Sequence, residues 1–179
     1  MTSTGPDLNV SLNLPFVSIG TSNVGAWLRR RPRPSPYMFI SVTCGLALDA
    51  TEVTGQGEWP RLRRPNGKPA QLWWLKPAGS SGEIHVVSAF NGMHLDAGRD
   101  VGKEPPVIDM WPDSGSASQR WRLSPSPDNR AQYLSGIGSG LVLDCPWDVS
   151  HEGHPTLWRK HGGENQHWVV AKPFAAAPV

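Results

Sequence analysis

The chain has 179 residues, 38% of them hydrophobic and 18% charged, a composition that predicts a packed core and argues against global disorder. Its formal net charge of +2 is too small to predict a nucleic-acid partner, and no apolar run approaches the roughly 18 residues that a membrane-spanning helix needs. With 19 glycines and 18 prolines, the chain has little room for long helices and favours short strands joined by turns.

The N-terminal extension, residues 1–36, combines a strand-like arm with a basic linker. Apolar and polar residues alternate over Asp7–Leu14, which is the period-two pattern of a β-strand. A lone pair of strands is marginal in water, so we expect the arm to form a homodimer with a second copy of the chain. Packing on its own domain or on another protein is the alternative. The basic, proline-rich run Arg29–Pro34 is interpreted as a solvated linker, with an anion-binding patch as the alternative.

Two motifs then recur three times with one period of 47 or 48 residues. The first motif reads Gly, apolar, variable, Leu, Asp, small, and it occupies Gly45–Ala50, Gly92–Ala97 and Gly140–Cys145. The second motif reads Gln-x-Trp, and it occupies Gln71–Trp73, Gln119–Trp121 and Gln166–Trp168. Because two separate motifs hold the same period, the sequence predicts three structural repeats.

Each repeat opens with a strand-like run and offers about four short strands. The opening runs are Tyr37–Val42, Ile84–Val87 and Ala131–Leu134. A unit this small cannot bury its apolar side alone, and a closed three-fold arrangement leaves fewer open sheet edges than a solenoid. The sequence therefore predicts one all-β domain over residues 37–174, followed by a short tail, 175–179. Its repeats cover about 37–82, 83–129 and 130–174.

These paired motifs resemble those of the ricin B-chain lectin family over about Tyr37–Lys172. The resemblance implies a β-trefoil that binds carbohydrate and is not an enzyme. It also implies that the Gln-x-Trp tryptophans Trp73, Trp121 and Trp168 pack into the central core. The resemblance implies a sugar site made of three groups. An Asp accepts hydrogen bonds from two sugar hydroxyls, an aromatic ring covers the apolar face of the sugar, and an Asn directly before the Gln bonds a hydroxyl. A carboxylate, a flat ring and an amide suit those contacts chemically.

The third repeat holds the complete set of site residues. It has Asp144, the ring of Trp158, and the pair Asn165 and Gln166. His161 lies between the ring and the amide in the sequence, and we expect it to contact the sugar as well.

The second repeat holds Asp96, Trp111 and Gln119, but Ser118 stands where the third repeat has Asn. Because serine is shorter and reaches a sugar only through water, we predict an impaired site there.

The first repeat keeps Asp49 but has Arg63 at the ring position and Ala70 at the Asn position, so we predict no binding. Since the Asp persists without the rest of the set, the alternative is that it serves the fold in all three repeats.

The resemblance implies galactose or N-acetylgalactosamine as the ligand. The alternative function is a protein-interaction trefoil, a protease inhibitor or an assembly subunit, that uses its loops and its N-terminal arm. No motif signals a catalytic triad or a pair of catalytic carboxylates. The segment His151–Pro155 and the later His161 do not predict a metal site, because Gly153 and Pro155 break the helix that a zinc-binding histidine pair needs. No cofactor is predicted.

The remaining expectations concern compartment and cysteines. Met1–Val10 has neither the basic nor the apolar region of a secretory signal, so we expect cytoplasmic synthesis, with release by a non-signal route left open. Cys44 and Cys145 are too few for a disulfide framework. They occupy non-equivalent positions in different repeats, and we expect them to be free thiols, separated by more than the roughly 7 Å Cα limit of a disulfide.

Overall fold

The computed structural model describes residues 35–51, 53–79, 82–98, 106, 108–147 and 153–173. The arm over Asp7–Leu14 and the basic run Arg29–Pro34 lie outside these residues, so their predicted roles stay predictions. Within the described ranges, no helix is long and apolar enough to cross a membrane.

Six strands form a closed antiparallel barrel. They pair in the order β1–β12–β9–β8–β5–β4, and a bridge between Tyr37 and Trp73 joins β4 back to the start of β1. The closure leaves the barrel without an open edge, as predicted from the three-fold repeat. The six strands are β1 (Met38–Ser41), β4 (Trp73–Pro77), β5 (Glu83–Ser88), β8 (Trp121–Pro125), β9 (Gln132–Gly136) and β12 (Trp168–Ala171).

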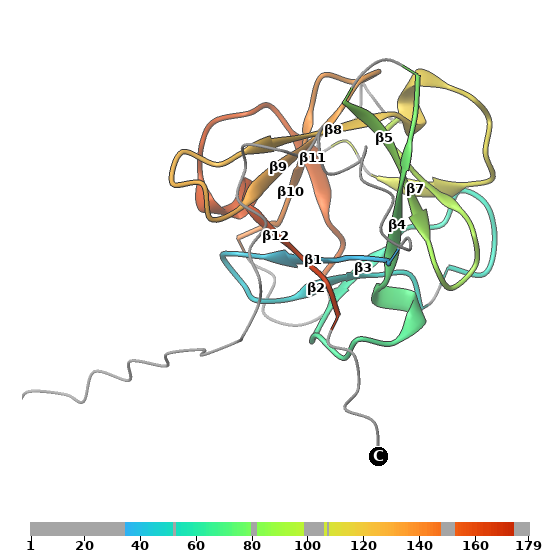
Figure 1. The fold of residues 1–179 in the computed structure, drawn as a ribbon, viewed down its shortest axis with the longest axis horizontal. Coiled ribbons are helices and arrows are strands. Elements are labelled where there is room, and N and C mark those ends of the chain that lie inside the picture. Colours follow the sequence, from blue (N-terminus) through green and yellow to red (C-terminus); the bar gives the residue numbers. More distant parts are fainter. Residues whose placement is uncertain are drawn as a thin grey trace, which may run out of the picture.

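Each repeat adds a two-stranded hairpin to the barrel. The hairpins are β2 (Ala47–Asp49) with β3 (Arg61–Arg63), β6 (His94–Asp96) with β7 (Asp109–Trp111), and β10 (Val142–Asp144) with β11 (Thr156–Trp158). A 3-10 turn then leads back into the barrel in each repeat: η2 (Pro69–Gln71), η3 (Ala117–Gln119) and η4 (Glu164–Gln166). In Figure 1 the three repeats surround the centre, the first in blue to green, the second in green to yellow and the third in orange to red.

Three equivalent backbone hydrogen bonds lock the hairpins together. Each runs from a hairpin of one repeat to a loop of another: Leu62 N to Gly153 O at 2.8 Å, Met110 N to Glu58 O at 2.9 Å, and Leu157 N to Pro106 O at 3.0 Å. A closed barrel with three such hairpins is a β-trefoil, so the predicted all-β fold is confirmed.

The three Gln-x-Trp tryptophans form the centre of the core. Trp73, Trp121 and Trp168 are each 0% exposed. Each indole N–H donates to the carbonyl of the Leu that precedes the motif Asp: Leu48 at 3.1 Å, Leu95 at 2.8 Å and Leu143 at 2.9 Å. The two sequence motifs are therefore physically connected, because each Trp ties the barrel to the hairpin of its own repeat.

The backbone conformation explains why a glycine opens the first motif in every repeat. Gly45, Gly92 and Gly140 have φ angles of 67°, 75° and 68°, in the left-handed region that side chains disfavour. Each ends the turn that leads from a barrel strand into a hairpin, and its N–H donates back to the last residue of that strand, so the recurring glycine marks this turn.

Candidate functional site

The third repeat brings four of its predicted site residues together: Asp144, Asn165, Gln166 and His161. Asp144 ends β10, and Asn165 and Gln166 lie in η4. The Asn165 amide donates to both carboxylate oxygens of Asp144, at 2.9 Å each, and the Gln166 amide donates to Oδ2 at 3.0 Å. Gln166 in turn accepts from the backbone N–H of His161 at 2.9 Å, so one network holds the turn, the carboxylate and the neighbouring loop.

This network keeps capacity to accept further hydrogen bonds. A carboxylate offers about four lone-pair positions, and the two amides use three of them. The Oδ1 atom of Asn165 is buried and has no hydrogen-bond partner among the described residues. Such an orphaned acceptor is costly unless a donor from outside the chain reaches it.

Electrostatics at this site centre on Asp144. Burial raises the pKa of Asp144 above its usual value, while hydrogen bonds from Gln166 and Asn165 and the nearby His161 act in the opposite direction. The Nε2 atom of His161 lies 3.7 Å from Oδ2 of Asp144, and 42% of the His161 side chain is exposed. The carboxylate therefore lies at the edge of the protein interior, with a histidine at its rim.

An exposed aromatic ring completes the third-repeat site. Trp158 ends β11 and is the cross-strand neighbour of Val142 on β10. It is 43% exposed, in contrast with the fully buried Trp168. The sequence-based separation of core and surface tryptophans thus agrees with their burial. Trp147, which directly follows Pro146 after β10, is 75% exposed.

Gly163 is a site residue that sequence reasoning missed. A Cβ atom at this position would lie 2.6 Å from Oδ1 of Asn165 and 2.7 Å from Cε1 of His161. Only glycine leaves room for both side chains as they stand. No pattern in the sequence marks Gly163, because the requirement comes from contacts across the folded loop.

The second repeat keeps the backbone contacts of its Gln and Asp, but among the described residues no bond joins the two. The Gln119 amide donates to the carbonyl of Pro112 at 2.9 Å, as Gln71 and Gln166 do to Arg64 and Arg159, and the Asp96 carboxylate accepts from Gly98 N at 2.8 Å. The Ser118 hydroxyl donates to Ser116 at 2.9 Å. Trp111 is half-buried, and its indole N–H donates to Asp109 at 2.9 Å. The serine is thus occupied locally, which is consistent with the predicted impairment.

The first repeat shows what the motif Asp does without a ring or an Asn. Asp49 is 1% exposed and accepts from Thr51 N at 2.7 Å and from the Gln71 amide at 2.9 Å. The Asp–Gln link therefore supports the fold by itself, as the alternative interpretation of this Asp holds. What the third repeat adds to the link is Asn165 and an exposed ring.

The histidine-rich segment of the third repeat is only partly described. His151 lies outside the described residues. His154 bonds the carbonyl of Pro60 at 3.0 Å, and its ring lies edge-on to Trp59 with centroids 5.3 Å apart.

The two cysteines are free thiols, as predicted, but their side chains are in contact rather than far apart. The Sγ atoms of Cys44 and Cys145 are 3.1 Å apart, and both thiols are free. Cys44 lies in the turn between β1 and β2, Cys145 directly follows β10, and both contact the same hydrophobic core. Non-equivalent positions of different repeats meet here because the hairpins converge on one core.

This contact predicts a reactive thiol. The hydrogen bond with Cys145 lowers the pKa of Cys44 to about 6, whereas the same bond and burial raise that of Cys145. Alkylation of Cys44 by iodoacetamide should therefore rise with pH through a midpoint near 6, since the thiolate is the nucleophile. Rates measured against pH, with the modified residue identified by mass spectrometry, test this.

The matched control is Cys145→Ala, which removes the donor and should move the midpoint upward, toward the ordinary value of 9.0. A midpoint near 9.0 in both proteins would contradict the assignment.

Comparison with protein families gives a match in the middle of the chain. Residues 69–153 match the model of the ricin-type beta-trefoil lectin domain-like family. The match runs from the first Gln-x-Trp motif into the third repeat, and it confirms the resemblance predicted from the repeats. No curated protein sequence matches the chain.

Solved structures share the fold at low sequence identity. The designed three-fold symmetric protein ThreeFoil is 24% identical, with a TM-score of 0.70, covering 77% of this chain and 99% of that one. The C-terminal half of the earthworm R-type lectin, in complex with GalNAc, is 20% identical, with a TM-score of 0.60, covering 78% and 100%. An exo-beta-1,3-galactanase from Clostridium thermocellum is 23% identical, with a TM-score of 0.72; 79% of this chain is covered but only 31% of the enzyme. These similarities establish a β-trefoil.

Proposed function

We propose that this ricin-type β-trefoil is a lectin that binds carbohydrate at its third repeat without catalysing a reaction. The proposed site consists of Asp144, Trp158, Asn165 and Gln166, with His161 at its rim. One observation carries the proposal: the exposed Trp158 lies on β11, the strand paired with the strand that ends at Asp144, while Asn165 donates to both oxygens of that Asp. In the first repeat the motif Asp accepts from Gln71 and from Thr51 N. Pro146 offers Asp144 no N–H at the equivalent place, so Asn165 takes over that bond, and the exposed ring is the addition that the fold does not require.

The chemistry of the site suits a monosaccharide. Two adjacent sugar hydroxyls donate to the Asp144 carboxylate, and bonds to a charged acceptor are the stronger kind. The C–H face of the sugar ring lies on the exposed indole of Trp158. A partly exposed His161 can bond a further hydroxyl at the rim.

Galactose or N-acetylgalactosamine is the proposed ligand. The support is the family resemblance, together with the GalNAc complex of the structurally similar earthworm lectin. One ring and a few hydrogen bonds should give a dissociation constant of about 1 mM, or roughly −4 kcal/mol. We propose a second, weaker site at Asp96, Trp111, Ser118 and Gln119, which would raise avidity for clustered glycans.

A glycan array followed by calorimetry with galactose and N-acetylgalactosamine tests the function. The matched variant is Asn165→Ala, because the first repeat carries Ala70 at this position and still folds. This variant should melt like the wild type and lose about tenfold or more in affinity, since it loses an amide bonded to a charged group. A wild-type protein that binds no glycan, or a variant with unchanged affinity, would refute the proposed site.

The location of bound sugar gives a separate prediction. In crystals soaked with galactose, density should appear beside Asp144, with weaker density beside Asp96. None should appear beside Asp49, because Arg63 and Ala70 replace the ring and the amide in the first repeat. Clear sugar density at Asp49 would contradict the prediction that the first repeat does not bind sugar.

A further inference from the structure

We propose that His85, His94 and Asp113 form a Zn²⁺ site in the second repeat. His85 lies on β5, His94 is the first residue of β6, and Asp113 follows β7 by two positions. One candidate ligand atom from each residue lies within 4.8 Å of the other two. Imidazole nitrogen and carboxylate oxygen are ordinary zinc ligands, and three protein ligands leave a fourth position for water or another donor.

An unsatisfied buried nitrogen points toward a missing ligand. His94 is 5% exposed, and its Nδ1 atom is buried with no hydrogen-bond partner among the described residues. That atom faces Oδ1 of Asp113 at 3.9 Å, which is too long for a hydrogen bond. A cation held between the nitrogen and the carboxylate would satisfy both groups.

The second histidine is held in a tautomer that suits a metal. Nδ1 of His85 lies 3.0 Å from the backbone carbonyl of Gln119. A carbonyl only accepts, so Nδ1 carries the hydrogen, and in the neutral ring Nε2 then keeps its lone pair for a metal. A hydrogen bond from the remote ring nitrogen to a carbonyl is the usual support of a metal-bound histidine.

The other repeats show that the fold does not require these side chains. The strand registers equate His94 with Ala47 and Val142, and His85 with Met38 and Tyr133. At the position of Asp113 the first repeat has Pro65, and the third has a lysine.

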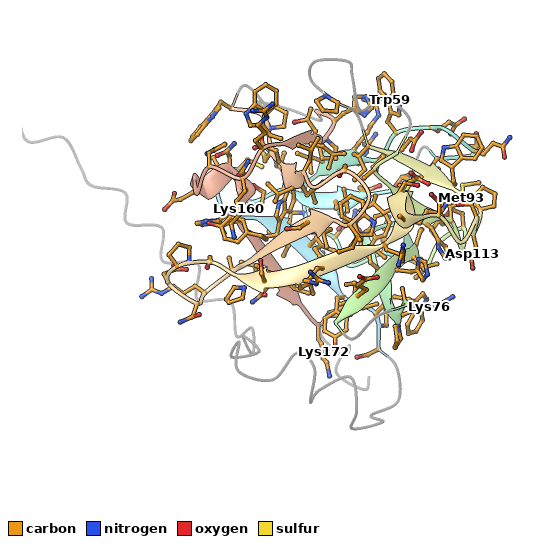
Figure 2. The ribbon with its side chains drawn as sticks, turned by 90° about the horizontal axis from the view of Figure 1, so that it is seen from above. Trp59, Lys76, Met93, Asp113, Lys160 and Lys172 are labelled. Atoms are coloured by element: carbon orange, nitrogen blue, oxygen red, sulfur yellow. The ribbon has the colours of Figure 1, made fainter. Side chains whose placement is uncertain are left out.

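The third repeat fills the equivalent place with an organic cation. There, Nζ of Lys160 lies 3.8 Å from the centroid of the Tyr133 ring. Figure 2 shows Lys160 and Asp113 well apart, on the left and on the right of the view, as members of two different repeats. In the third repeat an aromatic ring accommodates the lysine ammonium at this position. In the second repeat the equivalent positions carry side chains that can bind a metal ion.

Zinc binding requires a modest contraction of the cluster. Ligand atoms on one zinc ion are at most about 4.2 Å apart, twice a bond of roughly 2.1 Å. The Asp113 side chain is 64% exposed and can close the gap without disturbing the core. The positive charge of the nearby Lys76 disfavours a bound cation, whereas the negative charge of Asp96 favours one. The bound ion would link β5, β6 and the loop that leads into η3.

The test is calorimetric titration of Zn²⁺ into the full-length chain, purified without an affinity tag and freed of metal with a chelator. We expect one Zn²⁺ per chain and a higher melting temperature when zinc is present. Asp113→Asn changes an exposed ligand, and His94→Ala installs the residue that the first repeat carries. Each variant should bind zinc at least about tenfold more weakly, because each removes one of three protein ligands.

His154→Ala is the matched control, since it removes a histidine outside the cluster and should leave zinc affinity unchanged. Melting curves of the metal-free proteins establish that each variant folds. Absence of zinc binding by the wild type, a wild-type zinc affinity in either cluster variant, or a loss of zinc binding in the His154→Ala control would overturn the proposal. None of these readouts depends on sugar binding, so this inference and the proposed function stand or fall separately.

Discussion

Replacement of Trp168 by alanine is expected to lower the free energy of unfolding by about 3–5 kcal/mol, the usual cost of removing a large buried aromatic side chain. Trp168 is 0% exposed at the start of β12, and its indole N–H donates to Leu143 at 2.9 Å. The substitution leaves a cavity in the core and an unsatisfied carbonyl, and both effects destabilise the fold. Urea denaturation followed by tryptophan fluorescence and circular dichroism measures the change.

Trp121→Ala should cost about as much, because Trp121 is equally buried and donates to Leu95 at 2.8 Å. Equivalent losses in two repeats would show that the shared Trp–Leu link stabilises the trefoil. A Trp168→Ala protein that unfolds at the wild-type urea concentration would contradict its central role in the core.

The core was predictable because each repeat carries the same residues for the same packing and backbone contacts. The Gln-x-Trp motif recurs wherever a barrel strand must tie back to its hairpin, and the glycine recurs wherever the backbone takes a positive φ. These requirements are local to one repeat, so the sequence displays them at a regular period. The opening runs likewise correspond to β1, β5 and β9, with boundaries shifted by one or two residues.

Contacts between non-equivalent positions of different repeats were not predictable in this way. The contact between Cys44 and Cys145 arises where a turn of the first repeat meets the end of β10, and no periodic pattern encodes that distance. The cluster of His85, His94 and Asp113 combines three segments of one repeat, yet no motif spacing joins them. The room that Gly163 leaves for Asn165 is also a property of the folded loop alone.

The candidate site falls between these two cases. Its members were predictable from the resemblance, but their different roles emerge only from the contacts. The Asp–Gln link is present in the first repeat, where it supports the fold, and in the third, where Asn165 joins it. The backbone bond of the motif Gln is the same in all three repeats, to Arg64, Pro112 and Arg159, but among the described residues no bond joins Gln119 to Asp96. The motif therefore predicts the backbone contacts of the Gln better than its contact with the Asp.

Trp158→Ala is expected to remove most galactose and N-acetylgalactosamine binding while leaving the fold intact. Trp158 is 43% exposed, so its loss opens no core cavity, but it takes away the flat surface on which the sugar face would lie. With a dissociation constant of about 1 mM in the wild type, a tenfold loss would bring binding close to the limit of calorimetry. Calorimetry with both sugars and a thermal melt of each protein measure the two properties.

Trp59→Ala is the matched control, because Trp59 is 45% exposed and belongs to the first repeat, where no sugar site is proposed. Its removal should leave the sugar affinity unchanged, so a loss specific to Trp158→Ala would assign the ring to the ligand. If Trp158→Ala bound sugar as the wild type does, the exposed ring would have another purpose. The carbohydrate would then have to bind elsewhere on the trefoil, or not at all.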